Sequence, residues 1–82
     1  MDRTKEELIF LFNMKVEREK QLYKKWERYR SAGQMDKVAE VRGEVINLVD
    51  EMIEICDILD DKYNIKVIKN IHGKFEFINK GE

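Results

Sequence analysis

The stretch 35-MDKVAEVRGEVINLVDEMIEICDILDDKY-63 decides the fold of this chain, because its apolar residues recur at the spacing of a long helix. They follow alternating steps of three and four residues, and Arg42 is the single polar interruption: Met35, Val38, Val45, Val49, Met52, Cys56, Leu59 and Tyr63. This spacing is a heptad seam, the pattern of a helix that packs lengthwise against another helix.

Two further apolar rows flank this seam. One consists of Val41, Leu48 and Ile55, and the other of Ala39, Ile46 and Ile53. A helix that is apolar over so much of its circumference must be covered from two directions. The chain offers one other long helix, so the pattern predicts self-association or a protein partner.

Length and composition limit the ways in which this chain can be stabilised. Its 82 residues predict a single domain spanning residues 1–82. A chain of this size buries roughly 60–65% of its unfolded surface, so an isolated monomer is marginally stable. One cysteine and one histidine provide no internal disulfide and no histidine-rich metal cluster. Oligomerisation is the remaining way to stabilise the folded chain.

The composition is that of a helix-rich soluble protein, with 40% charged residues, 43% hydrophobic residues and no proline. No apolar run approaches the roughly 20 residues of a membrane span. The first residues lack the basic and then apolar order of a signal peptide. We therefore expect a cytoplasmic protein with no membrane contact.

A first helix is predicted over residues 4–32. Thr4 and Glu7 form a capping box at its start, and Gly33 suits the left-handed position that follows a helix end. Asn64 can end the second helix, over residues 35–63, in the same way. The short connection makes the helices antiparallel, and we expect Lys15 to face Asp50. The inward face of the first helix, interrupted by Glu19, is Leu8, Ile9, Phe12, Val16, Leu22, Tyr23, Trp26 and Tyr29.

Residues 65–79 read as a β-hairpin. A two-residue loop at His72-Gly73 predicts cross-strand pairs of Ile71 with Lys74, Lys69 with Glu76, Ile68 with Phe77 and Val67 with Ile78. A lone hairpin needs a surface to pack on. We expect Phe10 and Leu11 to receive the hairpin residues, in the same chain or from a second subunit: Phe75, Phe77 and Ile68.

The predicted fold is therefore mainly α, an antiparallel two-helix hairpin with a C-terminal β-hairpin, and two copies are expected to dimerise into a four-helix bundle. Glu19 and Arg42, polar residues in apolar seams, are expected to pair within the helical hairpin or between subunits. The predicted self-association residues are Val41, Val45, Leu48, Val49, Met52, Ile55, Arg42 and Glu19.

Charge is distributed unevenly along the chain. Residues 15–30 hold seven basic and three acidic side chains, whereas residues 35–61 hold two basic and nine acidic ones. The two segments attract each other if the helices lie side by side. Alternatively, a stripe on the first helix forms a surface for a protein partner or a nucleic acid: Lys20, Lys24, Lys25 and Arg28.

No residue pattern indicates an enzyme. Glu51, Glu54, Asp57 and Asp61 follow one face of the second helix, but no second acidic helix completes a metal site, so we expect a solvated face. Cys56 reads as a core residue and His72 as a turn residue. We expect no catalytic residue, no metal and no cofactor.

The functional expectation is a small non-enzymatic homodimer that acts as an adaptor or an inhibitor of a larger protein. The inhibitor version suits a protein encoded by a phage or a mobile element. The alternative is a nucleic-acid-binding regulatory protein that uses the basic stripe on the first helix.

Overall fold

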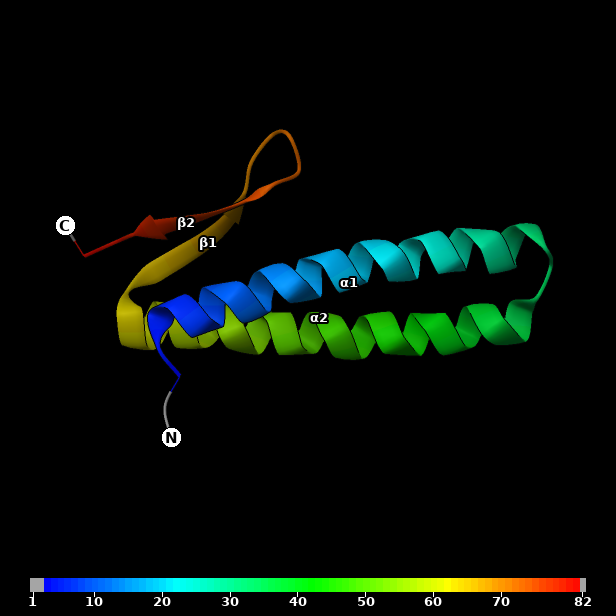
Figure 1. Cartoon of the computed structure of the whole chain (residues 1–82), viewed down its shortest axis with the longest axis horizontal. Coiled ribbons are helices and arrows are strands. Elements are labelled where there is room, and N and C mark those ends of the chain that lie inside the picture. Colours follow the sequence, from blue (N-terminus) through cyan, green and yellow to red (C-terminus); the bar gives the residue numbers. More distant parts are fainter. Residues whose placement is uncertain (1–2, 82) are drawn as a thin grey trace.

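A computed structural model describes residues 3–81. Two long helices, α1 (Lys5–Ser31) and α2 (Met35–Tyr63), pack antiparallel along their length. Two antiparallel strands follow, β1 (Ile65–Lys69) and β2 (Phe75–Asn79). The mainly α architecture predicted above is confirmed. Figure 1 shows the hairpin beside the end of the helix pair that holds the start of α1, while the end near the connecting turn carries no strand.

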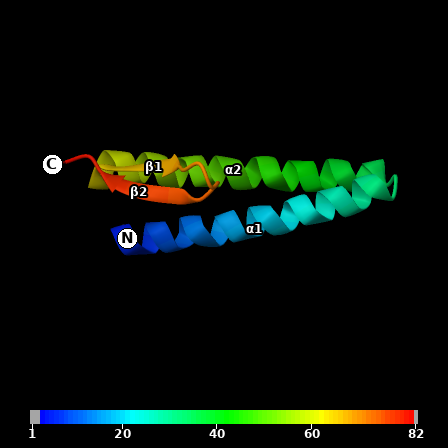
Figure 2. The ribbon, with the colours of Figure 1, turned by 90° about the horizontal axis from the view of Figure 1, so that it is seen from above.

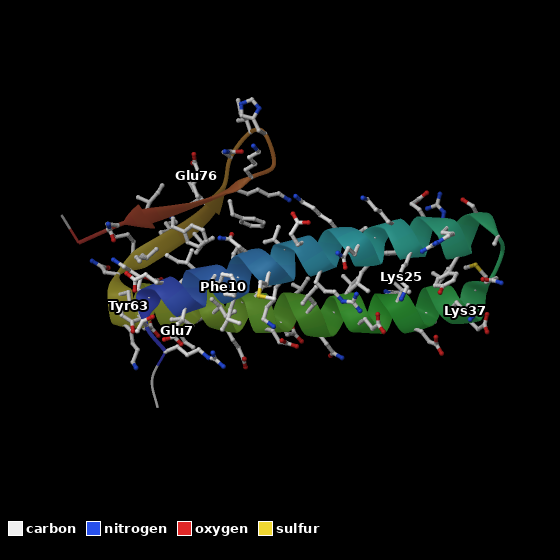
Figure 3. The ribbon with its side chains drawn as sticks, viewed as in Figure 1. Glu7, Phe10, Lys25, Lys37, Tyr63 and Glu76 are labelled. Atoms are coloured by element: carbon white, nitrogen blue, oxygen red, sulfur yellow. The ribbon has the colours of Figure 1, made fainter. Side chains whose placement is uncertain are left out.

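The helix ends form where the cap residues predict them. The Thr4 hydroxyl accepts a hydrogen bond from the Glu7 N–H at 3.1 Å, which satisfies one of the free donors at the start of α1. Gly33 has φ 73°, and Asn64 has φ 55° in the left-handed region, so each chain reversal uses a residue that tolerates that conformation. Tyr63 donates a hydrogen bond to the Arg3 carbonyl at 2.6 Å and joins the end of α2 to the start of α1 (Figure 3).

The core lies between the two helices and under the hairpin, and its buried residues are all apolar. α1 contributes Leu8, Phe12 and Leu22, and β1 contributes Ile65. α2 contributes a row that differs from the predicted seam: Val38, Val41, Val45, Leu48, Met52, Ile55 and Leu59. The predicted seam was wrong in part, because α1 covers the side of α2 that holds Val41, Leu48 and Ile55. Val49 and Cys56 lie at the edge of this covered side and are only partly buried.

The predicted contact between Lys15 and Asp50 is also corrected. Lys15 Nζ instead forms an ion pair with the Glu51 carboxylate, one residue further along α2. Lys37 Nζ lies 5.6 Å from the Tyr29 ring centroid near the connecting turn. Both contacts give the same axial alignment of α1 against α2. This alignment differs from the predicted one by less than one helical turn.

The hairpin register differs by one residue from the prediction. Val67 pairs with Phe77, Ile68 with Glu76 and Lys69 with Phe75. The loop is longer than two residues because the Asn70 side chain organises it: its Oδ1 accepts hydrogen bonds from the His72 and Lys74 N–H groups at 2.9 and 3.0 Å. Gly73 supports this loop with φ 79°. In this register Phe75 and Phe77 lie on the same face of the hairpin as Val67, and this face packs on the core.

Phe12, rather than Phe10 and Leu11, receives the hairpin. Its ring meets Phe75 and Phe77 edge to face, with centroid distances of 4.9 and 5.7 Å. Phe10 remains 63% exposed on the outer side of α1, where Figure 3 labels it. The expectation for Phe10 was wrong because Phe10 lies two residues from Phe12, and two residues rotate the helix by about 200°. The Phe10 side chain therefore points nearly opposite to the Phe12 side chain, which faces the hairpin.

The Asn70 loop leads to a stability prediction. Asn70→Ala removes the acceptor of two backbone N–H groups and should lower the free energy of unfolding by about 1 kcal/mol. Asn79→Ala, at an exposed strand position, is the matched control and should change it by less than about 0.5 kcal/mol. Urea unfolding of both variants provides the measurement. Equal effects would show that the Asn70 side chain does not hold the loop.

Candidate interaction surfaces

Most of the predicted self-association residues lie inside the chain's own core. Five of them are at most 8% exposed: Val41, Val45, Leu48, Met52 and Ile55. Val49 is partly buried, and Arg42 is exposed. In this fold α1 already covers the five buried residues. Another molecule can therefore contact only other side chains of α2.

A second heptad row remains uncovered on α2, and we call it the outer seam. It follows steps of four and three residues: Met35, Ala39, Arg42, Ile46, Val49 and Ile53. Met35 is 63% exposed, and Ile46 and Ile53 are each 52% exposed. Such a repeat on a free helix surface is typical of a helix that pairs with a second one.

The outer seam continues the side of α2 on which the hairpin lies. Asp60, whose carboxylate pairs with Lys80 from the end of the hairpin, lies seven residues after Ile53 and fourteen after Ile46. Residues seven apart share a face of a helix. The hairpin therefore covers one end of this face, and the outer seam is its uncovered remainder. In Figure 2, the hairpin overlies the helix pair at one end and leaves the other end bare.

α1 adds aromatic surface next to the outer seam. Tyr23 lies eleven residues, or about three helical turns, after Phe12 and so shares its face. Its ring stacks on Trp26 with a centroid distance of 5.9 Å and an interplanar angle of 20°. Tyr23 is 45% exposed. Both helices therefore present apolar side chains at the end of the helix pair that the hairpin does not cover.

Glu19 and Arg42 bring opposite charges to this face. Glu19 lies seven residues after Phe12 on α1, and Arg42 belongs to the outer seam. Within residues 3–81 neither side chain takes part in an ion pair, so the pairing predicted within the helical hairpin does not form there. The pairing predicted between subunits stays a prediction.

The basic stripe lies on α1 away from the core. Lys20, Lys24 and Arg28 are exposed, and Lys25, labelled in Figure 3, is partly buried. Lys20 Nζ lies 3.5 Å from a Glu17 carboxylate oxygen in an exposed pair of little energetic weight. Among the described residues, Lys24, Lys25 and Arg28 form no ion pair. The acidic helix therefore neutralises little of this stripe.

The opposite side of the helix pair is shallow and mixed in charge. A hollow between α1 and α2 has the apolar side chains of Leu8, Leu11 and Ile55 beside the Lys15–Glu51 ion pair. Of its polar lining, Lys15 and Glu51 pair with each other across the hollow.

Acidic side chains of α2 do not gather into a site. In the part of the chain that the structure describes, no three carboxylate, thiol or imidazole groups come together in a way that could hold a metal ion. Glu51, Glu54, Asp57 and Asp61 are all exposed, and Glu51 pairs with Lys15. Nor is any helix of residues 3–81 long and apolar enough to cross a membrane.

Cys56 is partly buried and packs against the core. Burial raises the pKa of its thiol above the ordinary value, and the negative charge of Asp57 raises that pKa further. The reactive thiolate is therefore scarcer than in an unstructured peptide at the same pH.

This pKa shift predicts slow and pH-shifted alkylation. The rate of Cys56 modification by iodoacetamide should rise at a higher pH in the folded protein than in urea. Because the folded thiol holds its proton longer, the free energy of unfolding should fall as pH rises through the pKa of the unfolded thiol. Cys56→Ala should lose that part of the pH dependence. Identical alkylation profiles with and without urea would contradict the prediction.

No family model matches the chain, and no curated protein or solved structure is significantly similar to it. The surfaces described above are therefore the basis for proposing a function.

Proposed function

We propose that this protein is a small non-enzymatic interaction module that acts as a homodimer and serves as an adaptor or an inhibitor of a larger protein. The single observation that carries the proposal is the outer seam, an uncovered heptad row on a helix whose other seam is already filled. Apolar surface arranged in this way favours the docking of another helix.

The extent of the exposed surface supports this proposal. The chain exposes 6333 Å², whereas a compact monomeric protein of its mass exposes about 5,200 Å². Its Cα trace measures 51 × 33 × 15 Å, which is one helix layer plus part of a strand layer. A second layer would bring the exposed area per chain toward the ordinary value.

In this proposal the charged outer faces bind the larger partner, and the outer seam holds the dimer together. The protein works in the cytoplasm, where its single thiol stays reduced. The inhibitor version suits a protein encoded by a phage or a mobile element.

Concentration-dependent thermal unfolding tests the homodimer. The Tm of the wild-type protein should rise over a hundredfold increase in protein concentration, because association stabilises the folded state by mass action. Ile46→Asp should abolish that rise. Ile58→Asp is the matched control, since Ile58 is 41% exposed on α2 but lies outside the outer seam, and it should retain the rise. A wild-type Tm that is independent of concentration would reject the homodimer.

A second candidate function is nucleic-acid binding through the basic stripe, favoured by the absence of ion pairs at Lys24, Lys25 and Arg28 within residues 3–81. Fluorescence anisotropy with labelled DNA and RNA at low and high salt tests it. Binding that weakens steeply with salt and is lost in Lys24→Gln/Lys25→Gln/Arg28→Gln would support it. No binding at low salt would exclude it.

A further inference from the structure

We propose that the second copy lies antiparallel on the outer seam, related by a two-fold axis that passes close to residue 44 of α2. The bare end of one helix pair then covers the bare end of the other. This inference rests on the proposed homodimer and adds the surface, the orientation and the register of the two chains.

The position of the β-hairpin selects the orientation. It lies over one end of the face that carries the outer seam, and the other end is bare (Figures 1 and 2). If the two copies packed parallel through this face, both hairpins would lie at the same end and collide between the two helix layers. In the antiparallel arrangement the two hairpins lie at opposite ends of the dimer, and the bare ends meet.

The heptad spacing limits the possible registers, and the sizes of the facing side chains select one of them. In an antiparallel pair of heptad helices, each seam residue meets one from the alternate position of the other helix. An axis near residue 44 places Ala39 opposite the partner's Val49 and Met35 opposite the partner's Ile53. The small Ala39 side chain leaves room for a branched one, and Met35 is flexible enough to fill the space beside Ile53.

The same axis brings the two unpaired charges together. The Lys15–Glu51 and Lys37–Tyr29 contacts fix the levels of α1 against α2, so Glu19 lies level with residue 47 of its own chain. The two-fold axis aligns residue 47 of one chain with residue 41 of the other copy, which is next to the partner's Arg42 in the sequence. Each Glu19 then lies at the axial level of the Arg42 guanidinium of the second chain, where opposite charges attract.

The exposed area is sufficient for such an interface. The chain exposes 6333 Å², roughly 1,100 Å² more than a compact monomer of its mass. A standard stable interface buries about 800 Å² on each partner. The excess, summed over the whole chain, therefore exceeds the area that a stable dimer would bury on each partner.

Disulfide trapping tests the arrangement. In a Cys56→Ser background, Ala39→Cys combined with Val49→Cys should form a covalent dimer under mild oxidation. The two sites are about 15 Å apart on one helix and cannot bridge within a chain. The single variants Ala39→Cys and Val49→Cys are matched controls and should stay unlinked, whereas a parallel arrangement would link each of them to its own copy.

Charge reversal supplies an independent readout. Glu19→Lys and Arg42→Glu, made singly, should each weaken dimerisation by about tenfold or more, and the double reversal should restore it. Light scattering separates the two levels of the proposal. A wild-type dimer in which the paired cysteines do not link, or in which the double reversal fails to restore affinity, would overturn the antiparallel register. A wild-type monomer would reject the proposed homodimer itself.

Discussion

Phe12→Ala should lower the free energy of unfolding by about 3–5 kcal/mol, the range for truncating a buried phenylalanine. Phe12 is 1% exposed, and its ring meets Phe75 and Phe77 edge to face. The substitution leaves a cavity between α1, α2 and the hairpin and removes two aromatic contacts worth about 0.5–1.5 kcal/mol each. Urea unfolding followed by circular dichroism measures the loss.

Phe10→Ala provides the control, because it removes the same side chain two residues away. Phe10 is 63% exposed and lies outside the core, so the expected change is below about 1 kcal/mol. The hairpin strands should also lose amide-exchange protection in Phe12→Ala and keep it in Phe10→Ala. Similar losses of stability in the two variants would contradict the proposed docking of the hairpin on Phe12.

Leu59→Ala should cost about 2–5 kcal/mol. Leu59 is fully buried in the cluster that also contains Leu8 and Ile65, where α1, α2 and β1 meet. Truncating its side chain opens a cavity that three elements line, and none of them can close it without moving the other two. The unfolding free energy should be compared at one protein concentration, since association shifts apparent stability.

Ile58→Ala is the matched control for Leu59→Ala. The two residues are adjacent on α2 and similar in size, but Ile58 is 41% exposed. Its truncation should cost no more than about 1.5 kcal/mol, because much of the side chain is already in water. If Ile58→Ala proved the more costly of the pair, the face of α2 that packs on α1 would be misassigned.

The helices could be predicted from local signals. Thr4, Gly33 and Asn64 each determine a helix end through the conformation or hydrogen bond of one residue, and the structure confirms all three. The apolar period of residues 35–63 extends over the whole of α2. Such signals act within a few residues, so a single sequence is sufficient to recognise them.

The hairpin register could not be predicted in the same way. The observed loop differs from a two-residue loop at His72-Gly73 by its hydrogen bonds around Asn70, whose side-chain oxygen accepts two N–H groups. The sequence permits both loops. The packing of Phe75 and Phe77 on Phe12 favours the observed one, because a shift of one residue would turn those rings away from the core.

The division of the apolar residues of α2 into a covered and an uncovered seam could not be predicted from the sequence either. The sequence shows three apolar rows on one helix but does not say which row α1 covers. α1 takes the row that holds Val41, Leu48 and Ile55, and the hairpin extends over one end of the neighbouring face of α2. The uncovered Ile46 and Ile53 belong to the row 39, 46, 53, whose seven-residue spacing was the available signal.

Light scattering of the wild-type protein at physiological salt tests whether a second copy covers the outer seam. We expect a molar mass of about twice 9.9 kDa. Ile46→Asp should return it to that of a single chain without loss of helical circular dichroism. A wild-type mass of 9.9 kDa at concentrations up to about 100 μM would contradict the claim and leave the outer seam exposed in solution.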